Sequence, residues 1–342
     1  MVRNHKKQFG WVCCWFGCWI ALGSVTYGQL TTSQKPAESA SSDETIGITF
    51  SHPVESVWEF GLKINATGEA RGISATVPIP MPWPEQEIEM LVEKKSDNIG
   101  RFVIKNPTKH TRQFSFKVNR IAAGQSESAL IRFKVKKRLI IAPADTSQFQ
   151  FASKVPTVVR TFLKSSPYIE SDDRRIKDLA GTLTDDTLSA WDQVEKNFRW
   201  VRDNIEYKFD KQIHSCLRAL EVKHGDCEEL SSLFIAICRA QGIPARAVWI
   251  PDHTYPEFYL HDKNGDGHWF PCQAAGQYEF GSMTEPKPIL QKGDRFRIPG
   301  QRNEVRYLRP TLVARHAPGG VSIEWISRQV DQGLLRDEGD HQ

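Results

Sequence analysis

The stretch HGDCEELSSLFIAICRAQGIPARAVWIP, residues 224–251, decides the fold of this chain. Apolar residues at helical spacing follow Cys227, and the Gly and Pro of GIP stop the pattern before ARAVWI, which is typical of a strand. Asp226 suits the N-cap position, and Glu229 three residues later completes a capping box. We therefore predict a helix that begins at Cys227 and is followed directly by a strand.

Cys227 lies in the first turn of this helix, on the side that faces the core. Unpaired backbone N–H groups and the positive end of the helix dipole favour an anion there. We therefore expect the pKa of the Cys227 thiol to fall from about 8.5 toward 4–7, which would make it a nucleophile. The alternative is a small buried hydrophobe. Cys238, about 16 Å further along the helix axis, is predicted to be inert core.

A nucleophilic cysteine needs a base, and the base must itself be oriented. His253 opens HTYPEFYL, a strand that follows ARAVWI, and the turn DKNGDG returns the chain as GHWFPCQAAG. This hairpin brings Gln273 near the start of the first strand, where His253 lies. Taken alone, His253 is more often an ordinary strand-end histidine. The order of cysteine helix, histidine strand and returning strand makes it the candidate base.

These motifs together resemble the transglutaminase-like superfamily of cysteine enzymes. GDCEELSSLF, GIPARAV, HTYPEFYL and GHWFPCQ match its motifs in order, and VEKNFRWVRDNIEYKF matches the helix ending in I-x-Y that precedes the cysteine. The resemblance covers about residues 160–280. It implies that Cys227 is the nucleophile and His253 its base. It also implies a papain-like fold, in which the cysteine helix packs on an antiparallel sheet that carries the histidine.

One position departs from the family pattern. The family places Asp four residues after the Trp of G-x-W, and here that residue is Gln273. A neutral amide can fix the imidazole tautomer by a hydrogen bond, but it cannot stabilise an imidazolium by charge. Papain-like proteases nevertheless use an amide in a Cys-His-Asn site. We therefore predict a Cys227-His253-Gln273 site in which Gln273 orients the base.

The remainder of the chain fits an α+β protein of two domains. Residues 46–142 have a period of two, as in VWEFGLKI, FSFKV and IRFKV, and predict an antiparallel β-sandwich without chemistry of its own. A stripe from Leu188 to Ile205 predicts a buried helix face in the transglutaminase-like catalytic domain, residues 143–290. Residues 291–330 are predicted to form a C-terminal β extension, and 331–342 a polar tail.

The N-terminus resembles a secretory signal peptide. Basic residues precede the apolar run FGWVCCWFGCWIALGSV, and small residues precede a cut after Gly28. We predict a signal peptide over 1–28, a flexible linker over 29–45, and an exported protein, periplasmic or secreted, without stable membrane insertion after cleavage. The alternative is an uncleaved anchor, for which the apolar run is short.

The remaining cysteines and the polar motifs predict no cofactor and no metal. Three of the seven cysteines lie in the predicted signal peptide; the other four do not form a disulfide scaffold in a chain of this length, and Cys216 with Cys272 is the pair to test. DKNGDG matches the start of a calcium loop but has Gln273 at position 12, so a hairpin turn is preferred. A zinc site built from Cys216, His224, Cys227 and His253 lacks the usual ligand spacing.

The net charge of the chain limits the classes of binding partner. A net charge of +4 over 342 residues predicts neither a nucleic acid nor a membrane surface. The expected partner is a peptide or protein substrate whose amide bond the thiol attacks. The family resemblance places hydrolysis, as a peptidase or amidase, ahead of cross-linking. The alternative is a cell-envelope binding or scaffold protein that keeps the fold without turnover.

Overall fold

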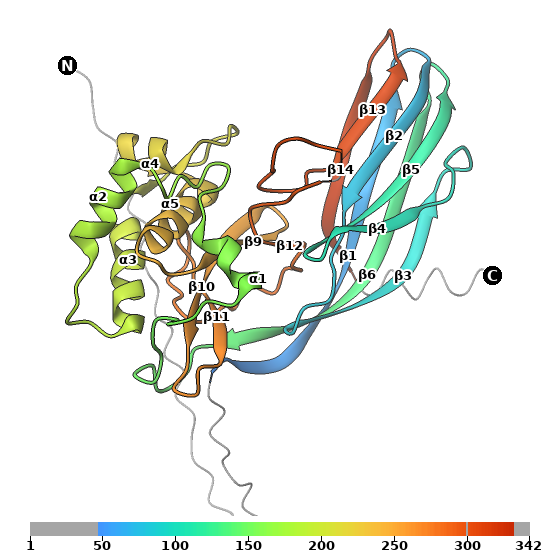
Figure 1. Ribbon diagram of the computed structural model, residues 1–342. Coiled ribbons are helices and arrows are strands. Elements are labelled where there is room, and N and C mark those ends of the chain that lie inside the picture. Colours follow the sequence, from blue (N-terminus) through green and yellow to red (C-terminus); the bar gives the residue numbers. More distant parts are fainter. Residues whose placement is uncertain (1–46, 299, 332–342) are drawn as a thin grey trace, which may run out of the picture. The chain divides into compact units, whose positions relative to one another are not determined.

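The computed structural model describes residues 47–298 and 300–331 (Figure 1). These residues belong to one compact unit. The predicted signal peptide (1–28), the linker (29–45) and nearly all of the polar tail lie outside the described residues. Within the described part of the chain, no helix is long and apolar enough to cross a bilayer.

A four-stranded antiparallel sheet forms one layer of the sandwich. Its order is β14 (Val321–Val330), β1 (Thr49–Ala66), β6 (Ser126–Ile141) and β3 (Gln86–Lys95). β1 lies between β14 and β6 and pairs with both over most of its length. The first and last strands of the described chain are therefore neighbours in one sheet.

The second sheet has eight strands and runs through both parts of the molecule. Its order is β11 (Gly267–Pro271), β10 (His253–His261), β9 (Ala245–Ile250), β12 (Gln291–Lys292), β5 (Thr111–Ile121), β2 (Ala70–Pro78) and β13 (Thr311–His316), and β4 (Val103–Thr108) pairs with β5. The two-residue β12 makes the connection, since Gln291 pairs with Trp249 of β9 and with Thr111 of β5. The strands of the core and of the sandwich thus share hydrogen bonds.

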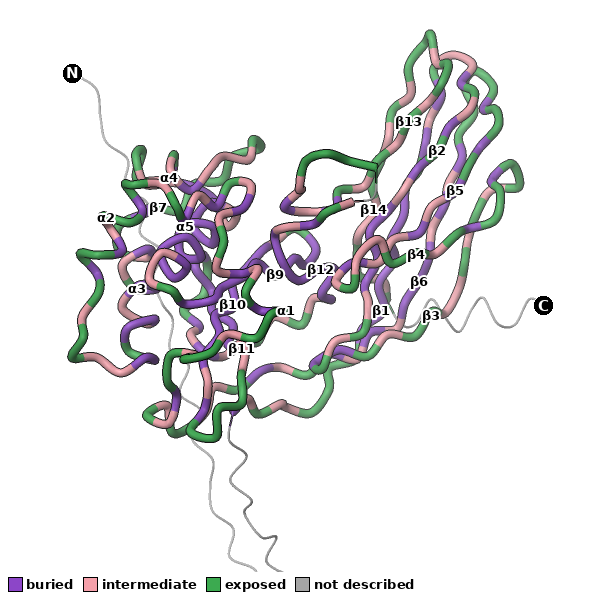
Figure 2. Tube along the Cα trace, viewed as in Figure 1, coloured by how far each residue is buried: buried purple, intermediate pink, exposed green. Residues whose placement is uncertain are grey.

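The sandwich core follows the predicted alternation. Trp58, Phe60, Leu62 and Ile64 of β1 are all buried. They join the inward side chains of β2, β5 and β6 in one apolar cluster. Burial accordingly follows the inner strands β1, β5 and β6 in Figure 2. β13 and β14, from the predicted C-terminal extension, pair with β2 and β1 and so complete the sandwich sheets.

Helices gather at the other end of the eight-stranded sheet (Figure 1). They are α1 (Thr157–Arg160), the 3₁₀ turn η1 (Thr161–Leu163), α2 (Arg174–Leu183), α3 (Ala190–Asn204), α4 (Cys216–Val222) and α5 (Cys227–Ala240). β7 (Glu206–Tyr207) and β8 (His224–Gly225) form a short parallel pair. On α3, Trp191, Val194, Phe198 and Val201 are buried, which confirms the predicted stripe.

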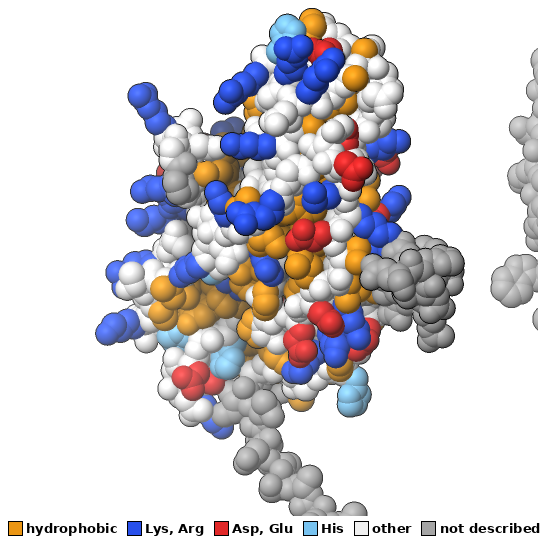
Figure 3. All heavy atoms as spheres, turned by 90° about the vertical axis from the view of Figure 1, so that its right-hand side faces the viewer, with side chains coloured by type: hydrophobic (Ala, Val, Ile, Leu, Met, Phe, Trp, Pro, Cys, Tyr) orange, Lys and Arg blue, Asp and Glu red, His pale blue; other side chains and the backbone are white. Residues whose placement is uncertain are grey.

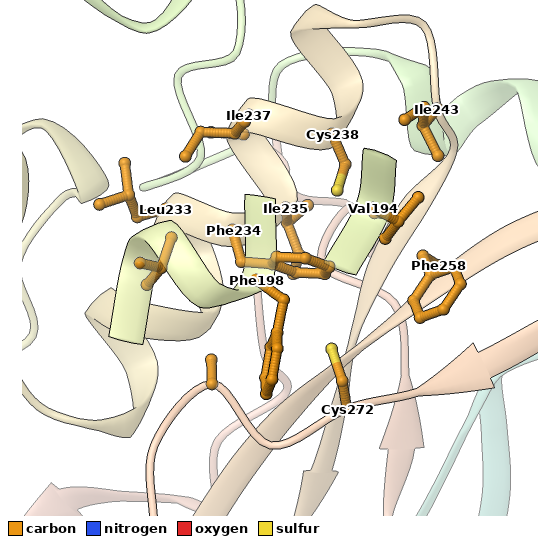
Figure 4. Packing of buried hydrophobic residues seen from close by; sticks show 14 of the residues in the cluster. Val194, Phe198, Leu233, Phe234, Ile235, Ile237, Cys238, Ile243, Phe258 and Cys272 are labelled. Carbon is orange, nitrogen blue, oxygen red and sulfur yellow. The ribbon is translucent and has the colours of Figure 1, made fainter. Parts of the chain in front are cut away.

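α5 is the central helix of this core. Its buried side chains pack against α3 on one side and against β10 on the other, as Figure 4 shows for Phe198, Phe234 and Phe258. The ring centroids of Phe234 and Phe258 are 6.5 Å apart. Cys238 and Cys272 lie in the same cluster and are fully buried. The cysteine helix therefore packs on an antiparallel sheet, and the predicted α+β fold is confirmed.

Three buried ion pairs hold α5 and the sheets together. At the end of α5, Arg239 Nη2 lies 2.7 Å from Asp294 Oδ2, and both side chains are completely buried. In β12, Lys292 Nζ lies 2.6 Å from Glu257 of β10 and 2.5 Å from Glu85, which precedes β3. Removing one partner of such a pair leaves an uncompensated buried charge. These contacts fix the position of β10, the strand that begins at His253.

The molecular surface is mixed in character. On the face shown in Figure 3, Lys and Arg side chains surround areas of apolar side chains. Among the described residues, several large apolar side chains are exposed, including Phe209, Val158 and Val313.

Candidate active site

A capping box defines the first turn of α5. The Asp226 carboxylate accepts a 2.7 Å hydrogen bond from the Glu228 amide, and Glu229 Oε2 accepts a 2.9 Å bond from the Asp226 amide. These bonds satisfy amides that the helix leaves unpaired. The prediction is confirmed, and Cys227 is the first residue of the helix.

The Cys227 thiol meets the beginning of β10. The backbone of Thr254 hydrogen-bonds the Cys227 sulfur. One turn later along α5, Ser231 Oγ donates a 3.3 Å bond to the Thr254 carbonyl. Because Thr254 directly follows His253, these contacts place the start of α5 next to the histidine end of β10.

The predicted acidity of the thiol is wrong. Burial raises the pKa of Cys227 to about 12, and the carboxylates of Asp226, Glu228 and Glu229 raise it further, while the bond from Thr254 lowers it. The helix terminus does favour an anion, but the same acidic residues that cap the helix place negative charge beside the sulfur. The resting cysteine is therefore a neutral thiol.

His253 and Gln273 are in direct contact. His253 Nε2 lies 2.8 Å from Gln273 Oε1, and the hairpin of β10 and β11 brings the two residues together as the sequence predicts. An amide oxygen only accepts hydrogen bonds, so Nε2 carries the proton. The other ring nitrogen, Nδ1, is then free of a proton in the neutral imidazole and can accept one.

Gln273 is held on several sides. Arg202 of α3 donates a 2.6 Å hydrogen bond to the Gln273 carbonyl, and the Gln273 amide donates a 2.9 Å bond to the Glu279 carbonyl. The side-chain amide nitrogen points to Met283 Sδ at 3.5 Å, which leaves Oε1 for the histidine. Sequence reasoning missed Arg202, because nothing in the helix pattern marks a side chain that reaches a distant loop.

A cavity opens beside the histidine. It has a volume of about 460 Å³ and is lined by His253, Gln273 and the segments 275–279 and 284–287. Asp252, at its edge, adopts a left-handed conformation with φ 56°, which makes the tight turn from β9 into β10. Non-glycine residues in this region are uncommon and concentrate at functional sites.

A buried arginine lies on another side of the α5 start. Arg306 Nη2 is 3.2 Å from Glu228 Oε2 and 3.3 Å from Ser232 Oγ. Its guanidinium carbon lies 5.3 Å from the ring centroid of Tyr168 and 5.0 Å from that of Trp249. Arg306 belongs to the segment between β12 and β13, so this segment packs against the first turns of α5. The sequence carried no signal for this contact.

The remaining cysteines and the DKNGDG turn make contacts that belong to the fold. The proposed Cys216–Cys272 pair is not bonded; both thiols are free and buried, and Cys216 Sγ lies 3.1 Å from Glu170 Oε2. In the turn DKNGDG, Asp262 Oδ1 accepts the amides of Asn264 and Asp266, as expected for a hairpin turn. Within the described ranges, no group of His, Cys, Asp and Glu side chains is arranged to hold a metal ion.

Comparison with known proteins agrees with this architecture. Residues 177–274 match the family model of the transglutaminase-like superfamily, so this part of the chain is similar to a transglutaminase-like core. The match includes Cys227, His253 and Gln273. No curated protein matches the chain.

Solved structures resemble the chain to different degrees. A candidate cysteine protease from Cytophaga hutchinsonii has a TM-score of 0.57 at 15% identity, over 83% of this chain and 93% of that chain, which shows a common fold. A candidate protease from Parabacteroides distasonis has a TM-score of 0.27 at 13% identity, over 65% and 47%. The periplasmic domain of TgpA from Pseudomonas aeruginosa has a TM-score of 0.30 at 12% identity, over 63% and 89%. The last two likenesses are too distant to support an argument.

Proposed function

We propose that this protein is an exported cysteine hydrolase that cleaves amide bonds of peptides or proteins, with Cys227 as nucleophile, His253 as base and Gln273 as the residue that orients the base. One observation carries the proposal. His253 Nε2 lies 2.8 Å from Gln273 Oε1, and the backbone of Thr254, the next residue in β10, contacts the Cys227 sulfur. The proposal brings together a nucleophile, a base and an orienting group, which nucleophilic catalysis requires.

The chemistry starts from a neutral thiol. As the sulfur attacks the substrate carbonyl carbon, its proton passes to His253 Nδ1, and the Cys227 backbone N–H stabilises the oxyanion. The imidazolium then protonates the leaving amine, the C–N bond breaks, and a thioester remains on Cys227. His253 next takes a proton from water, whose oxygen attacks the thioester, and the thiol and the product carboxylic acid are released. Gln273 keeps the Nε2 proton in place throughout.

A second candidate function is a scaffold or binding protein of the cell envelope without turnover. Two observations favour it. The thiol has a high pKa because it is buried among carboxylates. The group that contacts His253 is a neutral amide, which offers no charge to the imidazolium. Both features disfavour the thiolate form of Cys227 in the resting protein. A protein that keeps the fold but has no turnover would have the same two features.

Cleavage of a mixed peptide library, followed by mass spectrometry, separates the two functions. The hydrolase predicts cleavage by the wild type and a loss of at least about 10³-fold in Cys227→Ala, since removing a triad member leaves only residual catalysis. Lys177→Ala, at an exposed position of α2, serves as the control and should retain full activity. A wild type that cleaves no peptide, and forms no thioester detectable by mass, would favour the scaffold.

A further inference from the structure

A basic groove lies on the eight-stranded sheet, in its sandwich part, on the face that points away from the sandwich core. Its volume is about 530 Å³, and β2, β4, β5 and β13 contribute to its floor. Arg101, Lys105 and Lys117 line it and are exposed. No Asp or Glu occurs among the described residues that line the groove. The groove therefore carries unbalanced positive charge, although the net charge of the chain is small.

Hydroxyl groups accompany the cations. Ser115 of β5 lies between Lys105 and Lys117 across the β4–β5 pair, where Ser115 is opposite Val103. Thr76 and Thr311 lie side by side on β2 and β13, and their hydroxyls are 2.6 Å apart. Such groups can donate to and accept from an extended peptide backbone. Val313, 62% exposed, adds an apolar contact.

Strand register places the groove on the same face of the sheet as α5. Trp249 pairs with Gln291, and Gln291 pairs with Thr111, so these three side chains share one face. Trp249 belongs to the apolar cluster around α5. Because side chains alternate along a strand, Ser115 and Lys117 of β5 lie on the face of Thr111. The alternate residues of β5, such as Phe116, face the sandwich core.

The segment between β12 and β13 connects the groove with the candidate active site. Arg306, in this segment, is paired with Glu228 in the first turn of α5. Three residues later Arg309 is exposed, and Thr311, two residues further, lines the groove. Arg306 and Thr311 are five residues apart, and five residues of extended chain span at most about 18 Å. An extended chain that leaves the active site along this segment would therefore enter the groove.

We infer that the groove binds an acidic, extended segment of the polypeptide substrate and so directs acidic proteins to Cys227. The inference rests on the proposed function, since it takes the substrate to be a polypeptide. Carboxylates of the segment would pair with Arg101, Lys105 and Lys117, and its backbone would contact the hydroxyls. Exposed ion pairs are individually weak, so several in a row are needed for a measurable effect.

Binding is tested without turnover, in the full mature chain carrying Cys227→Ala. Fluorescence anisotropy measures a labelled twelve-residue peptide of alternating Glu and Ser, and a counterpart in which every Glu is replaced by Gln. We expect the Glu peptide to bind more tightly, and its affinity to fall as salt rises. The triple variant R101E/K105E/K117E should bind it about tenfold more weakly, which corresponds to three surface ion pairs.

The control variant K63E/K154E/K177E makes the same charge change at exposed positions outside the groove, and it should bind within about twofold of the parent. Circular dichroism checks that both triple variants fold. Equal binding of the Glu and Gln peptides, or equal weakening in both triple variants, would overturn the inference. So would binding of a polyuronic acid in place of the acidic peptide.

The outcomes for the two proposals are distinguishable. If the library is cleaved but acidic peptides do not bind the Cys227→Ala chain, the groove inference fails and the hydrolase stands. If acidic peptides bind through the groove but the wild type cleaves nothing, the hydrolase fails, and the groove is a binding site of the scaffold.

Discussion

Replacing Gln273 by Glu tests whether the histidine is coupled to the cysteine. Glu has the shape of Gln, so Gln273→Glu places a carboxylate oxygen 2.8 Å from His253 Nε2, where the amide oxygen lies now. The amide nitrogen, which approaches Met283 Sδ at 3.5 Å, is replaced by the second carboxylate oxygen. The substitution therefore changes the charge beside the imidazole and little else.

The burial of the site sets how much free energy the imidazolium–thiolate pair gains from this new charge. An opposite charge at hydrogen-bond distance shifts the pKa of a group toward its charged form by about 1–3 units, or about 1.4–4 kcal/mol. Gln273 is only 7% exposed, so part of this gain is offset by removing the new carboxylate from water. We therefore expect the imidazolium–thiolate pair to gain about 1.4–2.8 kcal/mol, which makes it about 10- to 100-fold more abundant.

Alkylation of Cys227 by iodoacetamide at pH 7, followed by mass spectrometry of the tryptic peptide, measures this abundance. Gln273→Glu should react about 10- to 100-fold faster than the wild type, and Gln273→Ala should react no faster. The buried Cys238 is the internal control and should stay unmodified in all three proteins. If Gln273→Glu folds normally and Cys227 reacts at the wild-type rate, His253 does not exchange a proton with the thiol, and the proposed mechanism is refuted.

Three further predictions concern acidity and stability. In the wild type, iodoacetamide should modify Cys227 slowly at pH 6 and steadily faster up to pH 10, because the pKa of the thiol is about 12; a plateau below pH 8 would contradict this. Burial and the neighbouring Glu229 raise the pKa of Asp226 to about 6, so the folded chain holds this proton more tightly than the unfolded chain and loses stability as pH rises from about 4 to 6. Asn also caps helices, so the unfolding free energy of Asp226→Asn should gain about 2–3 kcal/mol over the wild type between pH 4 and 7, and parallel urea curves would argue against the shift. Asp294→Ala should cost about 3–5 kcal/mol in urea unfolding because it leaves Arg239 buried and unpaired, whereas the exposed control Asp186→Ala should cost less than about 0.5 kcal/mol.

Local signals in the sequence were sufficient for the elements that bear the site. The capping box at Asp226 and Glu229 and the stop at GIP defined α5 closely, since these bonds form within a few residues. The hairpin turn brought Gln273 to His253 for the same reason. Alternation along β1 identified the buried face of the sandwich because one face of that strand is apolar.

Features that depend on distant residues were not predictable. Acidic residues near Cys227 could be seen in the sequence, but the burial that raises the pKa of its thiol arises only when β10 packs on α5. In the sequence, nothing distinguishes Arg202 and Arg306 from the other basic residues, because their contacts form only when the chain folds. Likewise, the sequence of residues 291–330 predicts a β extension but not which strands it joins.

The order of the strands bears on how the chain is made. The sandwich takes β1 to β6 from the beginning of the described chain and β13 and β14 from its end, with the helical core inserted between them. During synthesis, the edges of β1 and β2 that later receive β14 and β13 stay unpaired until the last strands have emerged. Such edges invite pairing with other chains. A chain that ended before residue 311 would keep its thiol, histidine and glutamine, yet we expect it to aggregate.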